Sequence, residues 1–206
     1  MVRTFRVFSI LSMFAGDLLS SPTNDYAHLL ESGDRHYRNF DNLAALEDYR
    51  RAYELAPNEF EPLVRMIRIH NDIGRSMLRN NDSAEVWYLR AVDYAEELME
   101  KYPQHAESYF WLALAKGSLV PFHSVQEKLD IGKFVVRHAR KAVEIDSTFG
   151  PAYVVLGILY REAARLTWYE ALIANVVFGG SLPGTIDDSE AALRRAIALN
   201  PNDIFA

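Results

Sequence analysis

Residues 26–58 read YAHLLESGDRHYRNFDNLAALEDYRRAYELAPN, and this stretch decides the fold. Small and large residues recur at helical spacing along both of its halves: Leu29, Gly33, Ala45, Tyr49 and Ala52. Alternating small and large residues on facing helices lets the two helices interdigitate. Pro57 then ends the second half, because proline cannot continue a helix. The stretch therefore predicts two helices packed closely against each other.

The stretch closes on Pro57 at the end of its second predicted helix. Similar helix ends recur along the chain, at residues 57, 103, 147 and 201, in steps of 46, 44 and 54. Proline occupies three of these positions, and Ser147 takes its place once. The four predicted repeats span about 26–58, 59–104, 105–148 and 149–202. Asp187 and Glu190 have capping-box spacing, which predicts the start of the last helix.

These positions resemble the tetratricopeptide repeat (TPR), a helix pair with a period of about 34 residues. The steps exceed that period, so we expect insertions, most simply longer helices or a longer turn between them. The predicted fold is all-α, a TPR-like solenoid of about four helix pairs within residues 23–206, with an inserted apolar helix in repeat four. The chain stops at Ala206 within the pattern of a further repeat, which predicts truncation inside an array.

In TPR proteins the first helix of each repeat lines a concave groove. Counting from the anchor residues places eight side chains there: Val64, Arg68, Asn71, Phe110, Leu114, Val154, Ile158 and Arg161. Repeat one offers Leu30, Asp34 and Arg38 at the same places. A mostly apolar groove of this kind suits an amphipathic helix or an acyl chain with an acidic head. The alternative is that these residues are core, covered by the insertion or by further repeats.

The insertion in repeat four contains an apolar block followed by Gly179, Gly180 and Pro183. Its most prominent side chains are Trp168, Tyr169, Leu172 and Phe178. Such a helix packs over the groove as a lid or contacts a membrane surface. The block lacks flanking lysine and arginine, which favours the lid.

The composition argues against several other classes of function. The net charge of −6 and the scattered basic residues do not suit nucleic acid as a partner. The chain has no cysteine, and its six histidines show no compact metal-ligand spacing. No phosphate-binding loop, dinucleotide glycine pattern or nucleophile elbow occurs. We therefore expect a non-enzymatic protein with no catalytic residues, no metal and no cofactor.

Residues 1–22 begin with Arg3 and Arg6, followed by a short apolar run. This outline is that of an export signal, although Asp17 follows the run directly and no clean cleavage site appears. The alternative is an amphipathic segment that docks on the first repeat. Export would make the protein periplasmic, and the alternative would leave it cytoplasmic. The run is too short to span a bilayer.

The chain also resembles the regulator of microtubule dynamics family. The motifs are GILYREAARLTWYEALIANVVFGG at 157–180, ALRRAIALNPND at 192–203 and WYLRAVDYAEELMEKYP at 87–103. The resemblance implies extended TPR repeats. It also implies a relation to proteins that are tethered to organelles or associate with microtubules, one of which is associated with phospholipid binding. The start of this chain departs from that family's long organelle anchor, so tubulin binding is not carried over.

Two functions follow as hypotheses. The first is a protein interaction scaffold that holds a peptide or helix of a protein partner in its concave groove. The second is a lipid-binding module whose apolar groove is covered by the repeat-four insertion. A lipid requires an enclosed apolar cavity, whereas a peptide requires an open groove with polar rims.

Overall fold

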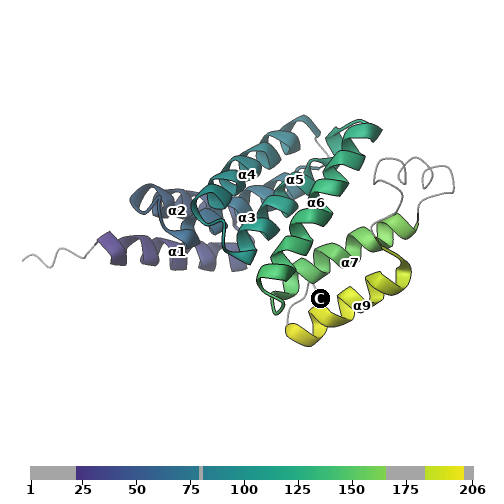
Figure 1. Cartoon of the computed structure of the whole chain (residues 1–206). Coiled ribbons are helices and arrows are strands. Elements are labelled where there is room, and N and C mark those ends of the chain that lie inside the picture. Colours follow the sequence, from purple (N-terminus) through teal and green to yellow (C-terminus); the bar gives the residue numbers. More distant parts are fainter. Residues whose placement is uncertain (1–21, 79–80, 166–183, 202–206) are drawn as a thin grey trace, which may run out of the picture.

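A computed structural model describes residues 22–78, 81–165 and 184–201, and every described element is helical (Figure 1). The helices are α1 (Pro22–Arg38), α2 (Asn42–Leu55), α3 (Phe60–Ser76), α4 (Asn81–Lys101), α5 (Ala106–Ser118), the 3-10 helix η1 (Val120–Phe122), α6 (Val125–Ile145), α7 (Gly150–Ala164) and α9 (Ile186–Leu199). Those residues contain no strand. The predicted all-α fold is confirmed.

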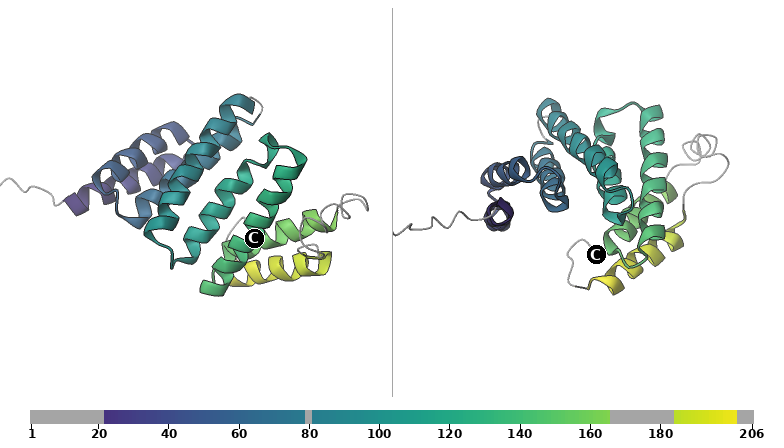
Figure 2. Two further views of the ribbon diagram at one scale, coloured as in Figure 1. Left: turned by 45° about the horizontal axis from the view of Figure 1, so that its top comes forward. Right: turned by 60° about the vertical axis from the view of Figure 1, so that its left-hand side comes forward.

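The helices pack as four successive antiparallel pairs, α1 with α2, α3 with α4, α5 with α6, and α7 with α9. Each pair also contacts the next one along the chain. Figure 2 shows that the pairs turn relative to one another: in its right-hand view α1 is seen nearly end-on, whereas α9 lies across the view. The molecule is therefore a curved stack of helix pairs, as a TPR solenoid requires.

The first helix of each pair forms the inner layer of this stack. The first helices of successive pairs contact one another, α3 with α5 and α5 with α7. Two arginines of α3 reach back to Asp34 on α1, which joins the first two pairs in the same way. The second helices α2, α4 and α6 therefore make up the outer layer together with α9.

Close approach within a pair depends on a small residue facing a large one. A Cβ atom added at Gly33 of α1 would lie 2.5 Å from Cε1 of Tyr49 on α2, which is fully buried. In the last pair, a Cβ atom at Gly157 would lie 2.6 Å from Cγ of Leu193. Gly33, which the sequence analysis named, and Gly157 thus mark close contacts within the first and last helix pairs.

The excess length of the middle repeats is helical. Helices α4 and α6 each have 21 residues, whereas α2 and α9 have 14. Seven residues are about two helical turns. Repeat two also has a tight contact of its own, because a Cβ atom at Gly74 of α3 would lie 2.8 Å from Cε1 of Tyr88 on α4. The prediction of lengthened helices is confirmed for these repeats.

Helix starts follow local side-chain chemistry. Asp41 accepts a hydrogen bond from the Ala44 amide at the start of α2. Helix α9 begins with a reciprocal capping box between Thr185 and Asp188. The predicted Asp187–Glu190 box was therefore wrong by two residues. Thr185 has the extended backbone that a capping residue needs, and Asp187 already lies inside the helix.

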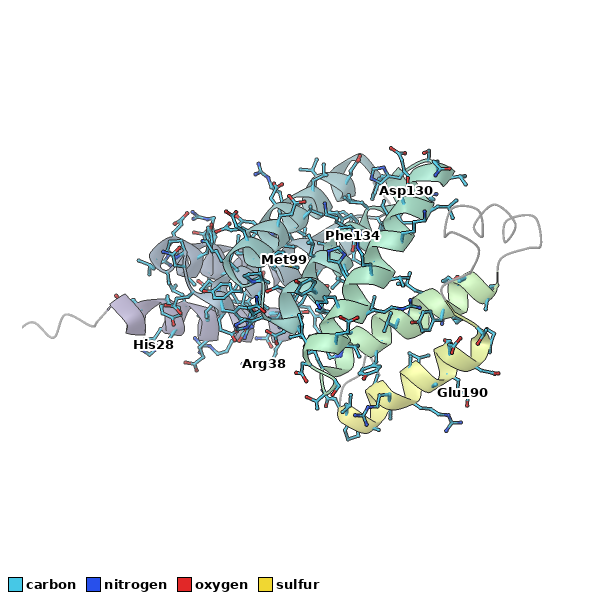
Figure 3. The ribbon with its side chains drawn as sticks, in the orientation of Figure 1. His28, Arg38, Met99, Asp130, Phe134 and Glu190 are labelled. Atoms are coloured by element: carbon cyan, nitrogen blue, oxygen red, sulfur yellow. The ribbon has the colours of Figure 1, made fainter. Side chains whose placement is uncertain are left out.

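The largest core cluster lies where α3, α4 and α5 meet, and it contains Leu63, Ile67, Leu98 and Leu112. Met99 of α4 and Phe134 of α6, both labelled in Figure 3, pack against it while remaining partly exposed. The middle two repeats therefore share one continuous core, which fixes the position of α5 in the inner layer.

Two predicted features fall outside the described residues. The predicted export signal falls almost wholly within residues 1–21, and the predicted lid residues Trp168, Tyr169, Leu172 and Phe178 fall within 166–183. Both remain predictions. Among the residues that the structure does describe, no helix is long and apolar enough to cross a membrane.

Candidate partner-binding surface

The apolar part of the inner layer comes from α5 and α7, which contact each other. Phe110 and Leu114 lie one turn apart on α5, and Val154 and Ile158 lie one turn apart on α7. Residues at this spacing share one face of a helix. Phe110, Leu114 and Val154 are half-buried, and Ile158 is 43% exposed. Four predicted groove residues therefore keep apolar surface in contact with solvent.

Arg161 follows Ile158 by one turn of α7. Its side chain is 49% exposed, and its Nη2 lies 2.9 Å from the carboxylate of the adjacent Glu162. It lines an open cavity of about 460 Å³ between α7 and α9, together with Leu193 and Glu190, which Figure 3 labels on α9. The guanidinium of Arg161 therefore lies one turn beyond the apolar strip on α7 and stays half exposed.

The predicted groove residues of repeat two lie in a different environment. Val64 is 7% exposed and belongs to the central core cluster, and Asn71 is 2% exposed. The Asn71 amide nitrogen donates to the Ile67 carbonyl at 3.1 Å, and its Oδ1 is buried without a partner. Helix α3 packs against both α4 and α5, which buries these side chains. In this conformation neither Val64 nor Asn71 offers its side chain to a partner.

Arg68 belongs to a polar cluster that joins α1 to α3. Asp34 of α1 accepts hydrogen bonds from Arg65 Nε at 3.0 Å, Arg65 Nη2 at 3.2 Å and Arg68 Nη2 at 3.1 Å. The Tyr49 hydroxyl donates to Asp34 Oδ1 at 2.6 Å and accepts from Arg68 Nη2 at 3.0 Å. A single carboxylate thus ties two arginines of repeat two to repeat one.

Burial and these hydrogen-bond partners shift the pKa of the Asp34 carboxyl in opposite directions. Burial raises its pKa, but the hydrogen bonds from Arg65 and Tyr49 and the charges of both arginines lower it, and the net result is a pKa below the ordinary 3.8. Asp34 is therefore ionised at neutral pH. Because its charge is already matched by two guanidinium groups, this part of the inner layer works as a clamp between repeats.

Further contacts of Tyr37, Asp72 and Arg68 extend this cluster. The Tyr37 hydroxyl donates to Asp72 Oδ2 at 2.7 Å, and Arg68 lies over the Tyr37 ring at 4.2 Å. Burial first, and then the bond to Asp72, raise the pKa of the Tyr37 hydroxyl to about 12. Counting positions along the sequence placed Asp34 and Arg68 in the groove. It did not identify Tyr37, Arg65 and Asp72, because the contacts of these side chains depend on how α1 is rotated against α3.

The described residues contain no group of three or more histidine, aspartate or glutamate side chains placed to hold a metal ion. Carboxylates of the inner layer, such as Asp34 and Asp72, are engaged by arginine or tyrosine. The surface therefore offers an apolar strip on repeats three and four beside a self-paired polar clamp on repeats one and two.

A comparison of the sequence with models of known protein families identifies the family of this chain. The model of the family described as regulator of microtubule dynamics protein 1-3 matches residues 29–205. The chain belongs to this family. The match spans all four helix pairs and confirms the resemblance seen in the sequence.

Two relatives from this family align with about two thirds of the chain. The mouse regulator of microtubule dynamics protein 1 is 23% identical over 142 residues, which cover 69% of this chain and 47% of that protein. The rat regulator of microtubule dynamics protein 3 is 23% identical over 139 residues, which cover 68% of this chain and 29% of that protein. The chain matches less than half the length of either relative.

A solved structure supports the fold. The crystal structure of a thermophilic TPR protein from Thermus thermophilus superposes with a TM-score of 0.57 at 17% identity, covering 87% of this chain and 93% of that one. The family member therefore has the fold of a TPR-type solenoid.

Proposed function

We propose that this protein is a non-enzymatic interaction scaffold that holds a peptide or helix of a protein partner against the inner faces of α5 and α7. The observation that carries the proposal is the strip formed by Phe110, Leu114, Val154 and Ile158, which stays partly exposed on two neighbouring inner helices. An amphipathic helix docks by laying its apolar face on such a strip.

The charge around the strip favours a partner with an acidic residue beside its apolar face. Arg161 lies one turn from Ile158 and is half exposed, and its carboxylate partner Glu162 is also exposed. An exposed ion pair of this kind is worth at most about 1 kcal/mol, so a partner carboxylate can compete for the guanidinium. Arg65 and Arg68 are less available, because Asp34 already binds both.

The test uses Ile158→Glu, which places a charge in the exposed part of the strip. The matched control is Val125→Glu on α6, where the valine is 72% exposed and lies away from the inner layer. Both variants and the parent chain are expressed with an affinity tag in the cells that produce the protein, and bound proteins are quantified by mass spectrometry. Proteins held by the parent and by Val125→Glu are expected to be lost with Ile158→Glu. Equal recovery with both variants contradicts the proposal.

The lipid-binding alternative makes a different demand on the structure. It requires a continuous enclosed cavity, whereas the cavities found between α7 and α9 and between α2 and α4 are open to solvent. The predicted lid lies outside the described residues. We place the protein partner first because the exposed strip on α5 and α7 supports it. Native mass spectrometry after exposure to phospholipid vesicles tests the alternative, since a bound lipid lost on Ile158→Glu would favour it.

The relatives are named for the regulation of microtubule dynamics, and that role is stated for those longer proteins. We propose for this chain only the class of partner, a protein segment, and no tubulin binding. Export through residues 1–22 stays part of the proposal. Fractionation of the producing cells tests it: a periplasmic chain shortened near residue 22 supports export, and a full-length cytoplasmic chain contradicts it.

A further inference from the structure

The outer layer carries an open cavity of about 320 Å³ where α2, α3 and α4 meet. Apolar and aromatic side chains make most of its wall: Leu43, Leu46, Met66, Val86, Trp87 and Tyr94. Leu43 is 66% exposed and Val86 57% exposed, although both are apolar. This cavity lies between second helices, on a different layer from the α5–α7 strip, and the proposed function does not use it.

His70 of α3 also lines this cavity and is 6% exposed. Its ring lies beside Trp87 and Tyr94, with centroid distances of 5.4 and 5.3 Å. The Nδ1 atom lies 2.7 Å from the Met66 carbonyl oxygen. A carbonyl can only accept, so Nδ1 carries the hydrogen in this bond, and in the neutral ring the lone pair is on Nε2.

No hydrogen bond joins Nε2 to any residue in the described part of the chain. Nε2 is also not one of the fully buried atoms that lack a partner, which are Arg68 Nε and Asn71 Oδ1. It therefore touches the cavity that the ring lines. An acceptor on a cavity wall that makes no hydrogen bond within the protein can be satisfied by water or by a donor group of a ligand.

The charges around the cavity lie at its rim. Glu47 and Arg50 of α2 pair with each other at 2.7 Å, and Arg50 also pairs with Glu54. Arg90 of α4 lies 4.0 Å from Asp93 and is 67% exposed. Apart from Glu47, Arg50 and Arg90 at the rim, no residue that lines the cavity carries a charge at pH 7. His70 is neutral at this pH, since burial lowers the pKa of its ring. The cavity therefore suits a neutral, mostly apolar group that donates one hydrogen bond.

We propose that this cavity is a second docking site, which receives a tryptophan side chain from a partner protein and satisfies His70 Nε2 with the indole N–H. Indole is a large apolar ring whose only polar atom is a donor, so it leaves no acceptor unpaired against the apolar wall. Tryptophan is also among the residues enriched as anchors at the centres of protein interfaces. The cavity volume suits one such side chain, with its open side left for the partner backbone.

The probe for this site is N-acetyltryptophanamide, whose blocked backbone mimics a residue within a protein. Its 1-methylindole analogue is the matched control, because it keeps the apolar ring and lacks the donor. The protein is labelled with ¹⁵N, and the imidazole Nε2 signal of His70 is followed by NMR during titration. We expect saturable binding that shifts this signal, and binding of the methylated analogue about 3- to 10-fold weaker, as the loss of one hydrogen bond requires.

Two variants locate the site. His70→Phe keeps an aromatic ring but removes the acceptor, so the two probes are expected to bind it equally. His138→Phe is the matched control, because His138 makes the same bond, from Nδ1 to the Phe134 carbonyl at 2.8 Å, on another repeat. Val86→Glu changes an exposed position on the cavity wall and is expected to weaken both probes by several-fold even if His70→Phe fails to fold.

Three results would overturn the proposal. The first is the absence of saturable binding of N-acetyltryptophanamide. The second is equal binding of the two probes to the parent protein, which would remove the role of Nε2. The third is unchanged binding to Val86→Glu, which would place the probe elsewhere. Because none of these measurements involves α5 or α7, failure here leaves the proposed inner-layer function intact.

Discussion

Gly33 lies in the middle of α1, where glycine is otherwise a poor choice, and its contact with Tyr49 explains its presence. Tyr49 is fully buried, and its hydroxyl is held by Asp34 on the same helix as the glycine. The ring therefore cannot move aside for a methyl group. Single atoms at such positions set how closely the two helices of a repeat approach.

Gly33→Ala is expected to lower the free energy of unfolding by about 1–3 kcal/mol, because the new Cβ atom would overlap the Tyr49 ring. The control is Gly117→Ala in α5, where the nearest atom to the new Cβ is Val135 Cγ2 at 3.6 Å. That change should leave stability unchanged or raise it by up to about 1 kcal/mol through helix propensity. Urea unfolding followed by circular dichroism measures both, and equal effects would contradict the packing assignment.

His70 makes the stability of the fold depend on pH. Burial lowers its pKa below the ordinary 6.5, more than the Met66 bond raises it, and the charge of Arg90 lowers it further. The unfolded chain therefore takes up the proton first, so stability is lost as pH falls from 6.5 towards the lowered folded pKa. His138 on α6 has a pKa shifted in the same direction by burial.

We expect His70→Phe to flatten the decline in unfolding free energy between about pH 7.5 and about pH 5.5, with the remaining slope due partly to His138. Urea unfolding at both pH values measures the slope in each protein. A slope unchanged by His70→Phe would show that this ring is not the group responsible.

At the scale of elements, one carboxylate connects two repeats. Asp34 on α1 holds Arg65 and Arg68 on α3, and the side chains of all three are between 22% and 28% exposed. Their partial burial makes the charged hydrogen bonds stronger than those of a surface pair. The clamp therefore fixes how the first helix pair is rotated against the second.

Asp34→Ala is expected to lower the free energy of unfolding by about 1–3 kcal/mol, because it leaves Arg65 and Arg68 without their shared partner. Glu31→Ala, on the same helix, removes only the exposed pair with Arg35 and should cost less than about 0.5 kcal/mol. The pKa of Asp34 is lowered, so its contribution is present above pH 3.8 and is lost as pH falls through the folded pKa. Thermal unfolding at pH 7 compares the two variants, and similar losses would contradict the clamp.

The sequence was most informative about elements and least informative about the contacts between repeats. The helix endings at residues 57, 103, 147 and 201 predicted four pairs, since proline and alanine spacing depend only on the local chain. The sequence left open whether Val64 and Asn71 line a groove or belong to the core, because their burial arises from α3 packing against both α4 and α5. The cavity beside His70 was missed for a related reason, since its wall is made of residues from three helices, α2, α3 and α4.

For the whole molecule, we propose different roles for the inner and the outer layer. The inner layer joins a polar clamp on the first two repeats to an apolar strip on the last two, and the outer layer presents the cavity beside His70. The strip residues lie on α5 and α7 and the residues of the cavity on α2, α3 and α4, so each surface can be tested by substitutions outside the other. The central claim is that α5 and α7 contact a protein partner directly.

Site-specific photo-crosslinking tests this claim most directly. The photoreactive residue p-benzoylphenylalanine is placed at position 158 on α7 or at position 125 on α6, both of which are exposed in the free protein. The cells that produce the protein are irradiated, and crosslinked products are identified by mass spectrometry. We expect a discrete protein adduct at position 158 and none at position 125. An adduct at position 125 alone, or no protein adduct at position 158, would contradict it.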